Sequence, residues 1–597
     1  MDLEATISNL EKMYEDAQKF ILDTTVRKLA EILKECKKYS HIAIVGGGIH
    51  TVHLINDFKD VVQSVDIIDE NVRQCNVVKH FPNYKVYDYE RIFKYDCLII
   101  SSFEYETSIA KKLIERKYNG KIVMPYQQLE QNGMCIPTEY YNLSEFPYIS
   151  SIIARSLMED KKYKLSALKH LIYISIHNRD LLWAKKYLKE CIKCYPEQAH
   201  TDNEALTIIY DIESELKQAF AKRNRKDIFA LWIDALRFDL SKKMPFFNKC
   251  RDNGTDFINF YSSAYSTRNT YGCMLKQMDE IDLFLIKNDR NILCDLLEQK
   301  GYASYRSGGE GVTKLCDYNY EVAKIVDYSV ASTKILWDSL LTALKSHQPS
   351  FIIIHTLLET HYPYISPISS LWNKYTTGSE KWKLLSNDNL ERYLNSALLS
   401  AQYLDMELEY YLSMVLSQGV AILFADHGTP LTRDTAQYKE DVFHLPLCIV
   451  GKRIECKIEK NFFNTKRFID IVESIVNNCE LQGEKYLHIN GIDCYNKNWI
   501  NEVINSETYH TGMQYNGIRT CRDMYIENAA GEKFYYILPN EVDNEIDNCE
   551  YQERINYLKE IVIRKHIDIY ILILNLRIHI CFIKHKGKNF YGQAKTR

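Results

Sequence analysis

The chain has 597 residues and a mass of 70.2 kDa, and 46% of its residues are hydrophobic, a composition typical of globular proteins. At about 150 residues per domain, this length predicts three or four domains. The formal net charge of −4 excludes a general nucleic-acid binder, because such proteins carry a large positive excess. No nucleic-acid partner is therefore expected.

Three features of the sequence favour a cytoplasmic location. The opening stretch MDLEATISNLEKMYEDAQKF is acidic and amphipathic, and it does not resemble a signal peptide. No apolar run reaches the length of about 18 residues that a membrane-spanning helix needs. The 17 cysteines follow no repeated spacing, which favours reduced thiols over a disulfide framework.

The first domain is expected to comprise residues 1–148. A helix is predicted over residues 1–38, where apolar positions recur at helical spacing. Hydrophobic runs then alternate with helical stretches, at 41–55 (a strand, a glycine turn and a helix), 65–71, 95–102 and 120–126. Strands that alternate with helices predict a parallel, doubly wound sheet.

The glycine turn after the first of these strands contains part of a dinucleotide-binding pattern. Gly46 and Gly48 open the turn, and Asp69 lies 21 residues beyond Gly48 at the end of the second strand. Such glycines let the backbone approach a pyrophosphate, and the acid binds a ribose hydroxyl. Thr51 stands where the third glycine would be. The domain resembles a Rossmann-type fold, with Gly46, Gly48 and Asp69 as candidate nucleotide-binding residues; a scaffold that binds a partner or nothing is the alternative.

Residues 149–224 have a purely helical pattern. The stretch LSALKHLIYISIHNRDLLWAKKYLKECIKCYP resembles one tetratricopeptide-type (TPR-like) helical hairpin that ends at Pro196. Because a self-standing solenoid needs about three repeats, a helical spacer is expected, with a docking surface for a protein partner as a further hypothesis. The charged run AKRNRKD at 221–227 is interpreted as a solvated linker.

A second α/β region, residues 225–545, contains acids at the ends of predicted strands. Asp234 ends the hydrophobic run IFALWID, and Asp426 and His427 follow the run VAILFA. Ligands of open α/β sheets bind at the carboxyl ends of the strands, so both acids are candidate cation ligands. For Asp234 taken alone, capping of the next helix is the competing interpretation.

The segment FINFYSSAYSTRNTYGCM, residues 257–274, crowds Ser and Thr hydroxyls between a predicted strand and a helix predicted to begin at YGCMLKQM. One interpretation is helix capping, because these side chains satisfy free amides at a helix start. The other is a nucleophile, since the helix dipole and free N–H groups favour an anionic substrate there. Farther along, the run PSFIII is predicted to be a strand, followed by a loop that contains His355 and His361.

In combination, these segments resemble the alkaline phosphatase and sulfatase superfamily from about residue 226 to at least residue 455. ALWIDALRFD resembles its first metal-binding strand, LFADHGTPL its SDHG motif, and EDVFHLPLCIVG the H-x-P-L strand that follows. FINFYSSAYSTRNTYG resembles the nucleophile segment of sulfatase-like phosphotransferases, and NILCDLLEQKGYASYRSGG the helix and turn after it. The resemblance implies an alkaline-phosphatase-like α/β/α sandwich, so the expected fold class of the whole chain is α/β.

The resemblance also implies roles for individual residues. Comparison of STRNTYGCM with the nucleophile motifs of sulfatase-like proteins and phosphoethanolamine transferases puts the catalytic threonine at Thr267, with Thr270 as the alternative. The implied metal ligands are Asp234, Thr267, Asp426 and His427. His361 and His444 would face the substrate phosphate or a second cation. Carboxylate, imidazole and hydroxyl ligands suit Zn²⁺ or Mn²⁺, and a divalent ion would hold the threonine as an alkoxide.

Two departures from the superfamily bear on the substrate. The C-x-P-x-R motif that true sulfatases convert to formylglycine is absent, and Thr267 stands in the cysteine position, which argues against sulfate-ester hydrolysis. Phosphoethanolamine transferases and lipoteichoic acid synthases carry Glu where this chain has Asp234, and they have transmembrane helices and an exported catalytic domain.

The resemblance therefore implies a phosphotransferase that moves a phosphoethanolamine or phosphoglycerol group to a glycan or glycolipid hydroxyl through a covalent phosphothreonine. Its donor is expected to be a phospholipid or a nucleotide-linked phosphate. A phosphodiesterase or phosphatase that uses the same site, and a scaffold without catalysis, are the alternatives.

Residues 546–597 are expected to form a basic, apolar extension. Its run IDIYILILNLRIHICFI is interrupted by Asp568 and Arg577 and is too short to span a bilayer. The alternation from Leu574 to Phe582 favours a strand. Contact with anionic lipid at the inner membrane surface is the alternative.

Overall fold

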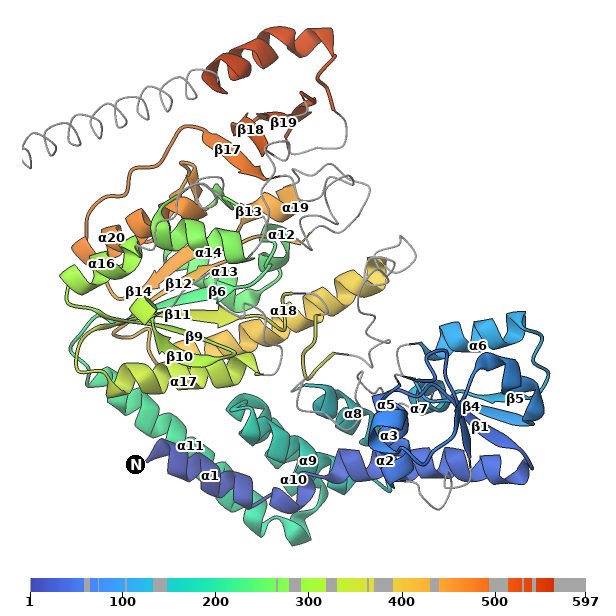
Figure 1. The fold of residues 1–597 in the computed structure, drawn as a ribbon. Helices are drawn as coiled ribbons and strands as arrows, with labels where there is room; N and C mark the ends of the chain where they lie inside the picture. The colour runs from blue at the N-terminus through green and yellow to red at the C-terminus, as the bar shows by residue number, and fades with distance from the viewer. Residues whose placement is uncertain are drawn as a thin grey trace, which may run out of the picture.

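The fold is seen in a computed structural model (Figure 1). It describes residues 2–57, 65–73, 75–102, 105–131, 148–264, 267–278, 291–317, 330–361, 364–369, 390–429, 440–492, 514–528, 531–538 and 544–562. The strands of these residues form sheets of five, eight, three and four strands. The predicted strand at 574–582 lies outside the described residues. No helix within the described ranges is both long enough and apolar enough to cross a membrane.

The five-stranded sheet near the N-terminus is parallel, as the alternation of strands and helices predicts. Its strands are β1 (Ile42–Val45), β2 (Asp66–Ile68), β3 (Val86–Tyr87), β4 (Cys97–Ile100) and β5 (Lys121–Val123). They lie in the order β3-β2-β1-β4-β5, and every neighbouring pair is parallel. The sequence does not reveal β3, because its two half-buried residues give little hydrophobic signal.

The described part of residues 149–224 contains four α-helices, which confirm the predicted helical pattern. They are α8 (Ile149–Leu157), α9 (Lys164–His177), α10 (Leu181–Cys194) and α11 (His200–Ala221). The N-terminal helix α1 (Leu3–Lys12) contacts α9 and α11, and Tyr14 beyond it donates a 2.7 Å hydrogen bond to buried Asp202. The first residues of the chain therefore pack against the helical region, while the tetratricopeptide relation stays a prediction.

The eight-stranded sheet is the centre of the second α/β region. Its strands, in spatial order, are β10 (Gly311–Lys314), β9 (Ala303–Gly308), β11 (Ser350–Thr356), β6 (Ile228–Ile233), β12 (Val420–Phe424), β14 (Leu447–Gly451), β7 (Thr255–Phe257) and β15 (Lys457–Glu459). β9, β11, β6 and β12 are parallel to one another. β11, β6 and β12 are buried along their whole length, which explains their uninterrupted hydrophobic runs.

Helices cover both faces of this sheet (Figure 1). On one face, α14 (Thr267–Lys276), α16 (Ile292–Gln299) and α20 (Phe468–Asn477) contact one another. On the other, α18 (Leu390–Leu412) contacts α13 (Pro245–Asp252) and α17 (Ser332–Lys345). The predicted three-layer α/β/α arrangement is therefore present in this region.

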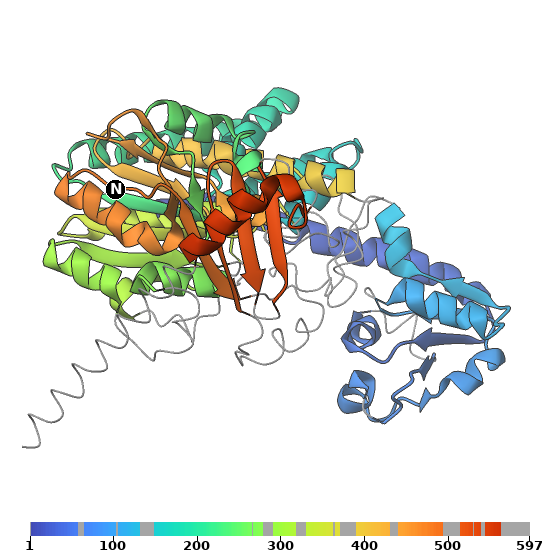
Figure 2. The same ribbon diagram turned by 90° about the horizontal axis from the view of Figure 1, so that it is seen from above.

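Two smaller sheets complete the described fold. One contains β8 (Phe260–Tyr261), β13 (His444–Leu445) and β16 (Phe463–Asn464). The other is antiparallel and contains β17 (Leu487–Ile492), β18 (Gln514–Arg519), β19 (Asp523–Asn528) and β20 (Lys533–Ile537). Figure 2 shows this four-stranded sheet and the N-terminal sheet at separate places beside the eight-stranded one.

Candidate metal centre

Two buried aspartates lie at the same edge of the eight-stranded sheet. Asp234 directly follows β6, and Asp426 follows β12 after one alanine. Because β6 and β12 are neighbouring parallel strands, their carboxyl ends meet at one edge. Both side chains are fully buried. The sequence therefore brings the two acids together through the register of two strands that are almost 200 residues apart in the chain.

Thr267 is the first residue of α14 and points into the same group. Its Oγ1 lies 3.3 Å from Asp234 Oδ2 and 3.0 Å from His427 Nε2. The prediction that this helix begins at Tyr271 is wrong: the polar residues between the two positions contain no proline or glycine, and they continue the helix back to Thr267. The hydroxyl is thus held at the N-terminus of a helix, where an anion is favoured.

Thr270, the alternative nucleophile, has a structural role instead. Its Oγ1 donates to the carbonyl of Ala264 at 3.2 Å and lies 3.4 Å from Ser262 Oγ. The side chain is fully buried. Within the hydroxyl-rich segment, Thr270 thus ties the loop to the helix and Thr267 reaches Asp234 and His427, while the capping and nucleophile roles stay predictions.

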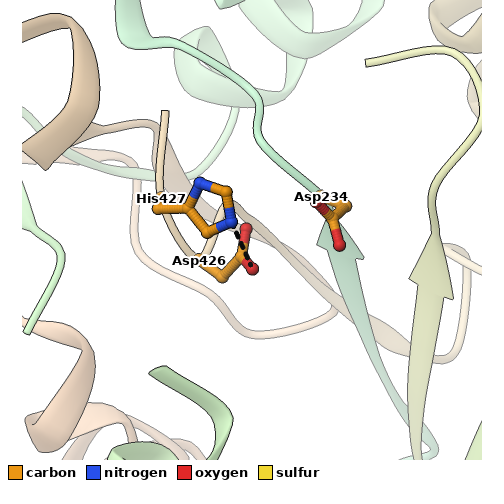
Figure 3. A group of neighbouring side chains, drawn as sticks. All are labelled: Asp234, Asp426 and His427. Atoms are coloured by element: carbon orange, nitrogen blue, oxygen red, sulfur yellow. Dashed lines mark ion pairs between the residues drawn. The ribbon is translucent and has the colours of Figure 1, made fainter. Parts of the chain in front are cut away.

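Asp234, Asp426 and His427 form a compact group with two unsatisfied oxygens. One side-chain ligand atom from each residue lies within 4.8 Å of the others (Figure 3). Asp234 Oδ1 and Asp426 Oδ2 are buried and accept no hydrogen bond from the residues that the structure describes. Burying a carboxylate oxygen without a partner is costly. A bound cation would satisfy both oxygens, so this donor set fits a divalent metal ion.

His427 presents a lone pair to this group. Its Nδ1 lies 2.7 Å from the carbonyl oxygen of Gly428, and a carbonyl can only accept, so Nδ1 carries the proton. In the neutral ring Nε2 is then an acceptor, and it lies 3.5 Å from Asp426 Oδ2. This tautomer is the one that a metal ligand requires.

The electrostatics of the group favour a cation. Burial raises the pKa of Asp426, and the charge of Asp234 raises it further. For Asp234, burial alone would raise the pKa, but the hydrogen bond from His355 and the positive charge that His355, His361 and His427 carry when protonated lower it to about 2. Burial opposes the charged form of His427, yet Asp426 and Asp234 together raise its pKa. The two acids thus repel each other, and both attract positive charge.

A strained backbone residue connects the two acids. Ala235 has a φ of 55°, a left-handed conformation that costs a non-glycine residue about 1 kcal/mol or more. In this conformation its N–H donates to Asp426 Oδ1 at 3.1 Å. Asp234 is held on the other side by Thr360, whose hydroxyl donates to its carbonyl at 2.6 Å. Nothing in the sequence marks an alanine as left-handed, so this connection could not be predicted.

The structure places the predicted histidines differently. His355 lies within β11 and not in the following loop, because the β-forming run continues through Thr356. His361 lies in the turn after β11, where its N–H donates to the Leu357 carbonyl at 3.1 Å, and its charge acts on Asp234.

His444 lies outside the group formed by the two aspartates and His427. It is in β13, stacked between Phe238 and Tyr261 with ring centroids 3.8 and 4.8 Å away. Its Nε2 is 2.9 Å from the carbonyl oxygen of Ile258. Its predicted contact with a substrate phosphate or a second cation stays a prediction.

The glycine turn of the N-terminal sheet is closed on one side and open on the other. Gly47 donates its N–H to Asp69 Oδ2 at 2.6 Å, and a Cβ at Gly47 would lie 2.8 Å from Cys75. Gly46 has a φ of 102°, a backbone conformation that favours glycine over residues with a Cβ. A Cβ at Gly48 would meet nothing within 4 Å. The structure therefore brings Gly46, Gly48 and Asp69 to one edge, and nucleotide binding there stays a prediction.

Comparison with known families bears on the second α/β region. Residues 235–477 match the family model described as Sulfatase. The matched segment begins directly after Asp234 and includes Thr267, Asp426 and His427. The predicted resemblance to sulfatase-like proteins is therefore confirmed for this part of the chain. None of the curated proteins compared with the chain matches it.

Three solved structures illustrate what part of this chain is similar to. The phosphonate monoester hydrolase of Agrobacterium radiobacter has a TM-score of 0.42 at 11% identity, over 58% of this chain and 96% of that chain. A 2-O GAG sulfatase, BT1596, has a TM-score of 0.41 at 10% identity, over 58% and 92%. A protein in the alkaline phosphatase superfamily from Vibrio parahaemolyticus has a TM-score of 0.35 at 13% identity, over 54% and 81%.

Proposed function

We propose that this chain is a metal-dependent phosphotransferase of the alkaline phosphatase superfamily. It would move a substituted phosphate, of the phosphoethanolamine or phosphoglycerol type, to a hydroxyl of a glycan or glycolipid, with Thr267 as the covalent carrier. The observation that supports this proposal is the position of the Thr267 hydroxyl, 3.0 Å from His427 Nε2 and 3.3 Å from Asp234 Oδ2. The same group of side chains contains two buried carboxylate oxygens, Asp234 Oδ1 and Asp426 Oδ2, that accept no hydrogen bond from the described residues.

The residues of the site fit both halves of such a transfer. In the first half, Thr267 Oγ1 attacks the phosphorus of the donor, the Oγ1–P bond forms, and the bond from phosphorus to the donor's leaving oxygen breaks. The hydroxyl proton is lost to solvent, and the leaving oxygen takes up a proton from solvent. In the second half, the acceptor oxygen attacks phosphorus and gives up its proton, the new O–P bond forms, the Oγ1–P bond breaks, and Thr267 Oγ1 takes up a proton.

Two properties of the site support phosphate as the group transferred. Thr267 lies in the first turn of a ten-residue helix, where free N–H groups and the helix dipole stabilise negative charge. A divalent ion held by Asp234, Asp426, His427 and Thr267 would neutralise charge on the phosphoryl oxygens and lower the pKa of the threonine hydroxyl. Phosphoryl transfer depends mainly on such positioning and charge neutralisation. The ligand set contains no thiolate and suits Zn²⁺ or Mn²⁺.

Hydrolysis is the second candidate, and the match to the Sulfatase family model favours it. Water would replace the acceptor hydroxyl, and the same residues would act on a phosphodiester or phosphomonoester. Sulfate esters are disfavoured as substrates, since Thr267 stands in the position of the cysteine that sulfatases convert to formylglycine. Acceptor choice depends on the shape of the pocket around the phosphothreonine.

The remaining parts of the proposal concern partners and location. The donor would be a phospholipid or a nucleotide-linked phosphate, and the acceptor a glycan or glycolipid. A cytoplasmic location, with contact at the inner membrane surface, fits a lipid donor. A protein partner would dock on helices α8 to α11.

The test is the mass of the intact protein after incubation with Mn²⁺ or Zn²⁺ and a panel of phospholipid and nucleotide-linked donors. We expect an adduct on the wild type and on Thr270→Val, and none on Thr267→Ala. The adduct mass identifies the transferred group. Turnover of a generic phosphodiester without any adduct would favour a hydrolase. If the wild type forms no adduct and hydrolyses no phosphodiester, a scaffold without catalysis would be favoured.

A further inference from the structure

His355 contacts the Asp234 carboxylate from a neighbouring strand. β11 pairs with β6, and the register sets His355 opposite Trp232. His355 Nε2 lies 2.7 Å from Asp234 Oδ2, a short distance for an N–H···O bond to a carboxylate. The ring is buried and stacks on the Trp232 ring, with centroids 4.2 Å apart and planes 22° apart. Packing and hydrogen bonding thus both fix the orientation of this imidazole.

A buried arginine sets the tautomer of His355. Arg306 is 1% exposed, and its Nη2 lies 3.5 Å from His355 Nδ1. A guanidinium can only donate, so Nδ1 is the acceptor and Nε2 carries the proton that is donated to Asp234. Arg306 is held in place by an ion pair with Glu310 and lies over the ring of Tyr271, 5.6 Å from its centroid.

The hydrogen bond distinguishes the two oxygens of Asp234. Oδ2 accepts hydrogen bonds from His355 Nε2 and Thr267 Oγ1, whereas Oδ1 accepts no hydrogen bond from the described part of the chain. A carboxylate that is held at one oxygen cannot rotate without breaking that bond. Its other oxygen, Oδ1, is therefore held in a fixed position, where it stays available to a cation.

We infer that His355, oriented by Arg306, is a positioning residue that holds Asp234 in the geometry needed to bind the divalent ion. This inference rests on the proposed function, because it assumes the metal site formed by Asp234, Asp426 and His427. Hydrogen-bond partners of metal ligands typically change metal affinity by about 10- to 100-fold when they are removed.

A pair of substitutions separates the hydrogen bond from the packing. His355→Gln keeps an N–H donor near the position of Nε2 and loses the aromatic ring. His355→Phe keeps a ring that can stack on Trp232 and loses the donor. The dissociation constants of Mn²⁺ and Zn²⁺ are measured on the full chain by equilibrium dialysis against a competing chelator, which requires no substrate. Asp426→Asn serves as the ligand-loss control.

We expect His355→Gln to bind the ions within about threefold of the wild type, and His355→Phe to bind them about 10- to 100-fold more weakly. The reverse order would show that the ring packing matters and would overturn the inference. Equal affinities of the Phe variant and the wild type would overturn it as well, while leaving the proposed function intact. Failure of the wild type to bind either ion, with no difference from Asp426→Asn, would overturn the proposed function and with it the role of His355.

The Phe variant could fail to fold, and the Gln variant then decides. A loss of tenfold or more in the well-folded Gln variant would contradict the role assigned to the donor. Arg306→Met gives an independent measurement, because it frees the tautomer of His355 without touching Asp234. We expect Arg306→Met alone to bind the ions more weakly than the wild type. The double variant Arg306→Met/His355→Gln should regain the wild-type affinity, because the glutamine amide donates its N–H without an arginine to fix a tautomer. If the double variant binds the ions as weakly as Arg306→Met alone, the inference that Arg306 acts on Asp234 through His355 is overturned.

Discussion

Neutralising Asp426 should have opposite effects on the metal-free and the metal-loaded protein. The ligand atoms of Asp234, Asp426 and His427 lie no more than 4.8 Å apart. Two unit charges at this distance repel by about 3.5 kcal/mol at an effective dielectric constant of about 20. Burial and the charge of Asp234 both disfavour the charged form of Asp426 and raise its pKa, so Asp426→Asn should relieve part of this repulsion, about 1–3 kcal/mol. The bond from Ala235 N–H is kept, because asparagine also offers an Oδ1 acceptor.

The metal-loaded protein should respond in the other direction. An ion present at about 100 times its dissociation constant stabilises the fold that binds it by about 2.7 kcal/mol, which for a domain of 150–250 residues raises the midpoint of thermal unfolding by roughly 5–10 °C. Asp426→Asn should lose this rise. The assay is differential scanning fluorimetry of both proteins, with chelator and with Zn²⁺ or Mn²⁺.

A matched control comes from the opposite end of the same strand. Asp227 precedes β6 and is also buried, but it forms an ion pair with Arg223 at 2.7 Å. Asp227→Asn should destabilise the protein with chelator and leave the metal-induced rise unchanged. The reasoning is refuted if metal-free Asp426→Asn melts below the wild type, or if metal raises its midpoint as much as that of the wild type.

Two further predictions concern residues away from the metal centre. Burial raises the pKa of Asp405 to about 6, above its ordinary value of about 3.8, so the folded protein holds this proton more tightly and the free energy of unfolding should fall by up to about 3 kcal/mol as pH rises from 4 to 7. Urea unfolding should show a flatter pH profile for Asp405→Asn, and an unchanged profile would contradict the assignment. Buried Glu106 accepts the N–H groups of Tyr126 and Gln127 at 2.9 and 2.8 Å at the start of α7 (Pro125–Gln131). Glu106→Ala should cost about 1–3 kcal/mol and speed hydrogen exchange of these two amides by roughly tenfold or more; exchange at the wild-type rate would show that the carboxylate does not hold the helix.

The parts of the site that the sequence predicts are those that depend on local composition. β6, β11 and β12 are buried on both faces, so each appears as a hydrophobic run, and the acids at the carboxyl ends of β6 and β12 are visible directly. Asp234 and Asp426 therefore stand out in the sequence. The position of Thr267 relies on the resemblance to known nucleophile segments, because capping by Ser and Thr gives the same pattern.

The parts that the sequence does not predict depend on contacts between distant strands. His355 continues the run of β11, so nothing local marks the end of the strand there, and its bond to Asp234 arises from the register of β11 against β6. Arg306 enters through a third strand, β9. The stack around His444 similarly depends on the pairing of β13 with β8. Register sets these partners, and it is not encoded in any single segment.

The left-handed turn at Ala235 gives the site the character of a preorganised chelator. Asp234 carries one carboxylate and is joined by a single peptide bond to Ala235, whose N–H donates to the other carboxylate, Asp426. The spacing of the two donors is therefore set by backbone geometry and not by the rotamers of long side chains. As in a rigid macrocycle, such a spacing favours ions by radius, because the donors cannot follow an ion that is too large or too small.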